Sequence, residues 1–87
     1  MSNYMMDYAN KILENLYVAV PKYQKARVTT VFKDRRWWAI LWSWDNRVLM
    51  STNESQDTAE GALRFLLETT SEWVYEKTQK MRVELIQ

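Results

Sequence analysis

Apolar residues recur at every third or fourth position over residues 3–19, a spacing typical of an amphipathic helix with one buried stripe. Pro21 disfavours helical geometry at the residue before it, so we expect the helix to end there. Ser2 or Asn3 can cap its first turn. The first predicted element is therefore a helix whose buried stripe consists of Met5, Tyr8, Ala9, Ile12, Leu16 and Ala19.

The apolar period changes to two between Lys25 and Thr52. β-Branched and aromatic residues dominate three stretches, 28–32, 37–44 and 47–52, and such compositions are typical of strands. The dipeptides Asp34-Arg35 and Asp45-Asn46 separate these stretches, and Asp and Asn tolerate the positive φ that two-residue hairpin turns require. The pattern predicts three antiparallel strands joined by two hairpins.

Helical spacing returns over residues 58–80, and Asp57 followed by Glu60 fits a capping box at the start of this helix. Residues 81–87 alternate like a short strand but also continue the helical spacing, and we favour the helix. The element order is then α-β-β-β-α. It predicts a single α+β domain over residues 1–87, in which a three-stranded antiparallel meander has two helices packed on one face.

The two turns fix a strand register, and the register sorts the strand residues into two faces. It places Arg27 opposite Trp42 and Val28 opposite Leu41 in the first hairpin. In the second hairpin it places Trp42 opposite Leu49 and Leu41 opposite Met50. The face without charge, which suits a helix layer, carries Ala26, Val28, Thr30, Phe32, Trp37, Ala39, Leu41, Ser43, Val48 and Met50.

The opposite face mixes large apolar side chains with cations. If both helices cover the uncharged face, this second face meets solvent as one large apolar patch, and such patches mark interaction sites. Trp and Arg are also enriched at interface hot spots. The predicted partner-binding residues are Arg27, Val31, Trp38, Ile40, Trp42, Trp44, Arg47 and Leu49. Two alternatives stay open: one helix on each face would make both Trp sets core, and a one-residue slip would exchange the first strand's faces.

The composition removes most catalytic chemistry. The sequence has no Cys and no His, so thiol catalysis and the commonest general base and metal ligand are absent. One Gly cannot form a phosphate-binding loop. Glu54, Asp57 and Glu60 are spaced like cation ligands, but carboxylates at a helix start are usually caps and dipole partners. We expect no enzyme, no metal site and no cofactor.

The net charge of +1 is unevenly spread along the chain. Residues 22–47 hold seven Lys or Arg against two Asp, a net charge of +5, interleaved with Trp38, Trp42 and Trp44. Cations beside stacking aromatics are the design of single-strand nucleic-acid binders, which makes that function an alternative on the same face. We favour instead a solvated face on which Arg27 lies over Trp42 and Arg47 over Trp44 as internal cation–π pairs.

The element order resembles that of the double-stranded-RNA-binding domain, in topology only. That family contacts RNA through a Gly-Pro-containing loop between its first two strands and a Lys cluster opening its last helix. Here the first hairpin loop is Lys33-Asp34-Arg35-Arg36, and the last helix opens with Asp57-Thr58-Ala59-Glu60. Acidic residues at that position would repel phosphates, so the family's function is not carried over.

We therefore expect a protein-interaction module that forms a homodimer through the Trp-rich sheet face or binds another protein there. A small inhibitor or adaptor that covers another protein's site is a further alternative. No apolar run approaches the roughly 18 residues of a membrane span, and the first residues lack signal-peptide character. We expect an intracellular protein with no membrane partner.

Overall fold

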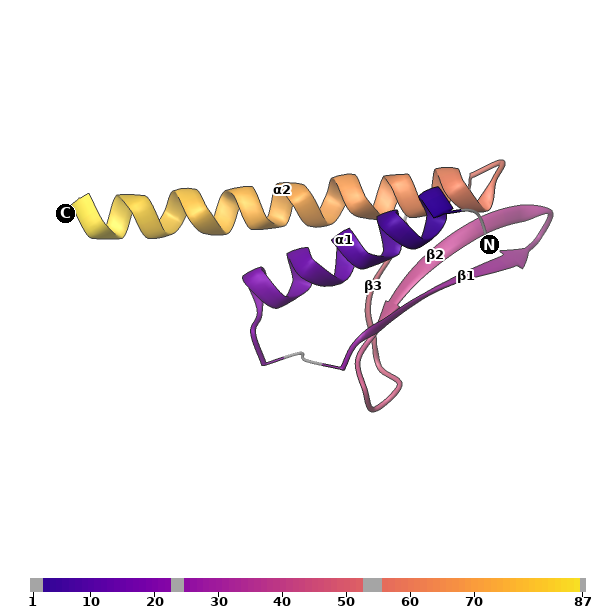
Figure 1. Cartoon of the computed structure of the whole chain (residues 1–87), viewed down its shortest axis with the longest axis horizontal. Helices are drawn as coiled ribbons and strands as arrows, with labels where there is room; N and C mark the ends of the chain where they lie inside the picture. Colours follow the sequence, from indigo (N-terminus) through magenta and orange to yellow (C-terminus); the bar gives the residue numbers. More distant parts are fainter. Residues whose placement is uncertain (1–2, 23–24, 53–55, 87) are drawn as a thin grey trace.

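The computed structural model describes residues 3–22, 25–52 and 56–86. Five elements follow one another in the predicted order, α-β-β-β-α (Figure 1). Their bounds are α1 Asn3–Ala19, β1 Arg27–Lys33, β2 Arg36–Trp42, β3 Val48–Ser51 and α2 Ala59–Ile86. The strands form one antiparallel sheet in the order β1-β2-β3, so the predicted meander is confirmed.

Both helices lie on the same face of this sheet (Figure 1). Ala39 and Leu41 of β2 lie on the same face because alternate strand residues share one face. Both are fully buried, since this is the face that the helices cover. This arrangement excludes the alternative with one helix on each face. The buried cluster joins α1, β2 and α2 and comprises Ile12, Leu16, Ala39, Leu41, Ala62, Leu63 and Leu66.

The β1–β2 hairpin has the predicted register, with Arg27 opposite Trp42 and Val28 opposite Leu41. Asp34 and Arg35 form its turn with φ values of 55° and 64°. Positive φ at both central residues is the signature of the turn that matches strand twist in two-residue hairpins. Asp adopts this conformation readily, whereas Arg35 does so less favourably. The first-strand slip considered from the sequence does not occur.

The β2–β3 hairpin differs from the prediction because its loop has three residues, not two. The Ser43 amide donates to the carbonyl of Arg47 at 2.9 Å, so Trp44, Asp45 and Asn46 form the loop. Asn46 supplies the positive φ, 65°, that such a loop needs at its last position. The expected two-residue turn at Asp45-Asn46 was therefore wrong.

A β-bulge then absorbs the extra loop residue. Trp42 pairs with Val48 rather than with Leu49, while Leu41 pairs with Met50 as predicted. The register shifts between Leu41 and Trp42, which leaves Leu49 as the extra residue of β3. The predicted pairing of Trp42 with Leu49 and the assignment of Val48 to the helix-covered face were both wrong for this reason.

Helix α2 begins one residue later than the capping-box interpretation requires. Thr58 is the cap, because its hydroxyl accepts the backbone N–H of Gly61 at 2.9 Å. Asp57 instead forms an ion pair with Arg36 of β2, which ties the helix entry to the sheet. At its other end the helix continues to Ile86, as the spacing of residues 81–86 favoured.

Helix α2 extends well beyond the sheet and beyond α1 (Figure 1). Its 28 residues correspond to about 42 Å of helix. Lys77 donates from Nζ to the carbonyl of Ala19 at 3.1 Å, so a cation of α2 satisfies the C-terminal end of α1. The radius of gyration, 13.9 Å, exceeds the value of about 12 Å expected for a compact chain of this length, which fits the elongated helix.

Candidate functional site

The sheet face turned away from the helices is the candidate site, and we call it the open sheet face. On central strand β2 it presents Trp38, Ile40 and Trp42, the residues that alternate with buried Ala39 and Leu41. No described helix covers it, since α1 and α2 both pack on the opposite side (Figure 1). With their cross-strand partners, its members are Arg27, Thr29, Val31, Lys33, Arg36, Trp38, Ile40, Trp42, Val48 and Ser51.

Two neighbours from β1 contact the side chain of Trp42. Its indole N–H donates to the Thr29 hydroxyl at 2.7 Å. The guanidinium carbon of Arg27 lies 5.1 Å from the ring centroid, which is a cation–π geometry. This is the Arg27–Trp42 pair expected from the sequence. Both contacts restrict the ring in the free chain, so a partner that bound there would order this side chain at little further entropy cost.

Trp38 borders a shallow hollow at the end of the face near the β1–β2 turn. Its indole N–H donates to the carbonyl of Lys33 at 3.2 Å. The hollow has a volume of about 410 Å³ and is lined by Val31, Lys33, Asp34, Trp38, Ile40 and Ser51. The N–H groups of Trp38 and Trp42 are thus both used within the chain, so these rings offer a partner apolar surface rather than a hydrogen-bond donor.

Trp44 lies at the opposite end of the face, in the β2–β3 loop. Among residues 5–22, 25–52 and 56–79, it is the most exposed large apolar side chain, with 71% of its surface accessible. Ser43 next to it is buried and organises the loop, accepting the Arg47 amide at 3.2 Å and donating to the carboxylate of Asp45. Arg47 forms an ion pair with Asp45 at 3.2 Å rather than lying over Trp44 as expected.

The loop carboxylate Asp45 has a pKa below its ordinary value. The main cause is the hydrogen bond from the Ser43 hydroxyl; the nearby Arg47 charge also lowers this pKa, while partial desolvation opposes it. Because folding lowers the pKa, the contact stabilises the folded loop above the unfolded pKa of about 4 and is lost as the pH falls through the folded-state value. The ordered loop is therefore acid-sensitive.

We expect Ser43→Ala to raise the pKa of Asp45 towards its ordinary value, because it removes the largest cause of the shift. Titration of the Asp45 carboxyl carbon by NMR, over about pH 2 to 6, measures this change. Arg47→Gln is the matched control and should raise the same pKa by less. An unchanged titration in Ser43→Ala would contradict the hydrogen-bonding described for the loop.

The structure keeps most of the sequence-predicted partner-binding residues together but removes one. Arg27, Val31, Trp38, Ile40 and Trp42 share the open sheet face, with Trp44 and Arg47 in the loop at its end. Leu49 is partly buried and packs against the core cluster, because the bulge turns it from the expected side.

Val48, which pairs with Trp42 and is 54% exposed, takes the place expected for Leu49. Ser51, opposite Ile40, is a further member of the face that was missed from the sequence. Its position follows from the pairing of Leu41 with Met50, which the sequence did predict. The signal for Ser51 was therefore present in the register, whereas that for Val48 was not.

Carboxylates partner two of the cations at this site. Arg36 pairs with Asp57 and Arg47 with Asp45, while Arg27 lies over Trp42. Exposed ion pairs contribute little stability, but they lower the positive potential that a phosphate backbone would meet. The open sheet face itself carries the cations Arg27, Lys33 and Arg36, and the carboxylates of Asp34, Asp45 and Asp57 lie at its edges, so the charge around the face is mixed.

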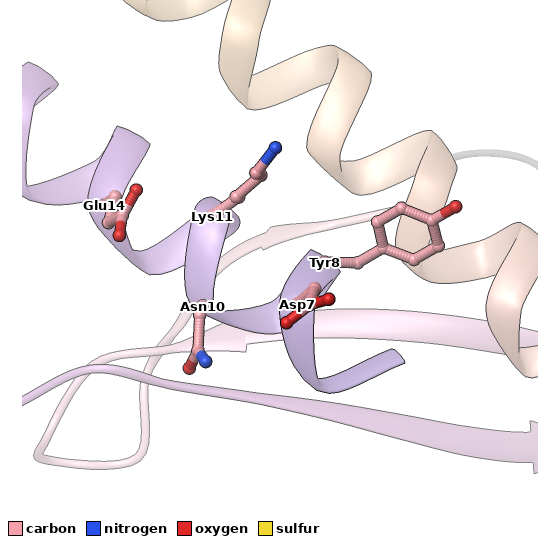
Figure 2. Close-up of a pocket in the computed structure, with 5 residues that line it drawn as sticks. All are labelled: Asp7, Tyr8, Asn10, Lys11 and Glu14. Carbon is pink, nitrogen blue, oxygen red and sulfur yellow. The ribbon is translucent and has the colours of Figure 1, made fainter. Parts of the chain in front are cut away.

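A second hollow, of about 430 Å³, lies along α1 and is lined by Asp7, Tyr8, Asn10, Lys11 and Glu14. Figure 2 shows that these side chains point in different directions and do not converge on one point. Tyr8 extends towards α2, where the guanidinium carbon of Arg64 lies 5.9 Å from its ring centroid. A ligand site needs convergent polar groups, so this hollow offers no defined chemistry.

Metal and membrane features were sought in the part of the chain that the structure describes. Within those residues, no three Asp or Glu side chains gather closely enough to hold a metal ion. Glu54, one of the three carboxylates considered from the sequence, lies outside the described residues. None of the described helices combines the length and the apolar character needed to cross a membrane.

No protein-family model, curated protein or solved structure matches this chain. The likeness to the double-stranded-RNA-binding domain therefore stays one of element order. The first hairpin turns at Asp34 and Arg35, and α2 opens with a Thr58 cap followed by Glu60. The functional argument depends on the surface chemistry of the chain itself.

Proposed function

We propose that this chain is a non-enzymatic protein-interaction module that self-associates through its open sheet face. The supporting observation is the row of Trp38, Ile40 and Trp42 on the central strand, on the face that neither helix covers. A sheet needs a second layer on only one side to fold, so three large apolar residues on the other side suit a partner.

A second copy fits this face better than a nucleic acid does. The indole rings are fixed by contacts with Thr29, Arg27 and the Lys33 carbonyl, so they are preorganised for flat apolar packing. The cations Arg36 and Arg47 already have carboxylate partners, which weakens attraction for phosphates. In a two-fold dimer the open sheet face of one copy contacts the same face of the other copy. A rim that carries both cations and carboxylates can pair with an identical rim.

The dimensions of the face predict a modest affinity. Its longer strands have seven residues, which is about 23 Å, and three strands about 4.8 Å apart span about 10 Å between the outer axes. The surface area that each copy would bury on such a face approaches only the lower end of the range for stable interfaces, about 600 Å² per partner. We therefore expect a concentration-dependent dimer with a dissociation constant in the micromolar range rather than an obligate one.

Sedimentation equilibrium and light scattering across the micromolar range test this proposal. The mass should rise from 10.5 kDa towards twice that value with concentration, and it should do so at high salt because the contact is mainly apolar. A constant monomer mass throughout would overturn the proposal. Titration with mixed oligonucleotides then separates the alternatives: Trp quenching that weakens steeply with salt indicates nucleic-acid binding.

A further inference from the structure

The open sheet face carries a projecting side chain at one end and a hollow at the other. Trp44 projects from the β2–β3 loop, 71% exposed. The hollow of about 410 Å³ beside Trp38 lies near the β1–β2 turn. We propose that two copies pair so that Trp44 of each chain is seated in the hollow of the other. This inference rests on the proposed function and specifies its geometry.

A two-fold axis accounts for this pairing. When two open sheet faces meet with their β2 strands antiparallel, an axis through the middle of the face exchanges its two ends. The Trp44 end of one copy then lies over the Trp38 end of the other, and the reverse contact forms at the same time. Two equal anchor contacts result, one at each end of the interface, with Ile40 and Trp42 between them.

The hollow matches Trp44 in chemistry. Val31, Trp38 and Ile40 supply apolar walls, and Ser51 adds a hydroxyl that can accept an indole N–H. A Trp that becomes buried needs such an acceptor for its N–H group. Large aromatic side chains in preformed pockets near the contact are the usual hot spots of protein interfaces. Trp44 combines exposure in the free chain with an apolar receptor on the same face.

The charges beside the two ends are complementary. Asp45 and Arg47 flank Trp44, whereas Lys33 and Asp34 line the hollow. Pairing the ends brings Asp45 towards Lys33 and Arg47 towards Asp34 of the second copy. Within one chain these groups lie at opposite ends of the sheet, more than about 20 Å apart by strand length. Contacts of Asp45 with Lys33 and of Arg47 with Asp34 can therefore form only between copies, where they would replace the Asp45–Arg47 ion pair of the free chain.

Trp44→Ala is the first test, by sedimentation equilibrium on the full chain. We expect the dimer dissociation constant to rise roughly 30-fold or more, as for a hot-spot residue. Trp44→Phe should raise the dissociation constant by less, because it keeps an aromatic side chain at this position. Tyr75→Ala, which removes an aromatic of similar exposure (65%) that lies on α2, is the control and should leave the dissociation constant within about threefold. Circular dichroism verifies that each variant is folded.

Charge exchange between the two ends is the second test. Lys33→Glu alone should weaken the dimer, and adding Asp45→Lys should recover part of that loss, because Asp45→Lys restores the charge pairing between copies but removes the loop contacts of Asp45 with Ser43 and Arg47. A wild-type dimer that neither Trp44→Ala nor the charge variants weaken would overturn this inference while leaving self-association intact. A wild-type chain that stays monomeric at every concentration would instead remove the proposed function, and the inference with it.

Discussion

Leu41→Ala is expected to lower the free energy of unfolding by about 2–5 kcal/mol. Leu41 is fully buried at the centre of β2, where Val28 and Met50 flank it and residues of both helices pack over it. Removing its isobutyl group leaves a cavity that the adjoining layers cannot close. A domain of 87 residues has a total stability of only about 4–13 kcal/mol, so this loss is a large part of it.

Urea denaturation followed by circular dichroism measures the effect, at a concentration low enough to keep the chain monomeric. The denaturation midpoint should fall with little change in slope. Ile40→Ala is the matched control, because Ile40 directly precedes Leu41 on β2 but lies partly exposed on the open sheet face. Ile40→Ala should lower the free energy of unfolding by less than half as much as Leu41→Ala. Equal losses at both positions would mean that both faces of the sheet are covered in the folded chain.

Residue patterns alone predicted the first helix and the first hairpin closely. The apolar stripe of α1 and the fixed φ of Pro21 define where that helix ends. In the first hairpin only the Asp34-Arg35 turn brings the apolar residues of β1 and β2 onto common faces. A register shifted by one residue would place Val28 with the cations, so burial selects a single pairing.

The loop length and register of the second hairpin could not be predicted from such patterns. Asp45-Asn46 fits a two-residue turn, and Asn46 also fits the last position of a three-residue loop. Val48 and Leu49 are both apolar, so neither alternation nor burial distinguishes the bulged register from the regular one. The observed longer loop is stabilised by the Ser43 side chain, which donates to Asp45 and accepts from the Arg47 amide. The cap of α2 is a similar case, since Asp57 and Thr58 are both good caps.

Most members of the candidate site were predictable, but the place of Val48 on the face and the shape of the face were not. Alternation along β2 placed Trp38, Ile40 and Trp42 on one face. Alternation alone did not say which face the helices cover, although the lack of charge on the opposite face favoured that one. That outcome depends on packing between the helices, where Asn15 of α1 donates to Thr70 and Ser71 of α2 at 3.1 Å. The hollow beside Trp38 likewise forms from three strands and a turn at once, so no local pattern encodes it.

Trp42→Glu is expected to yield a folded monomer. Trp42 lies on the open sheet face outside the buried cluster, so a carboxylate there stays in water in the free chain. It also faces Arg27 across the β1–β2 pair, where opposite charges are favourable. We expect a loss of about 1 kcal/mol in stability, from the lost Thr29 hydrogen bond and ring packing.

In the dimer the same substitution would place a carboxylate between two apolar faces. Desolvating this carboxylate and its partner Arg27 between apolar faces costs several kcal/mol, which is enough to raise the dissociation constant at least 100-fold and abolish a micromolar dimer. Sedimentation equilibrium measures the mass, and circular dichroism in the near and far ultraviolet measures the fold. Trp42→Phe, which keeps an aromatic ring, should remain largely dimeric. A variant Trp42→Glu that loses its near-ultraviolet signal would place Trp42 in the core, and one that stays dimeric would move the interface elsewhere.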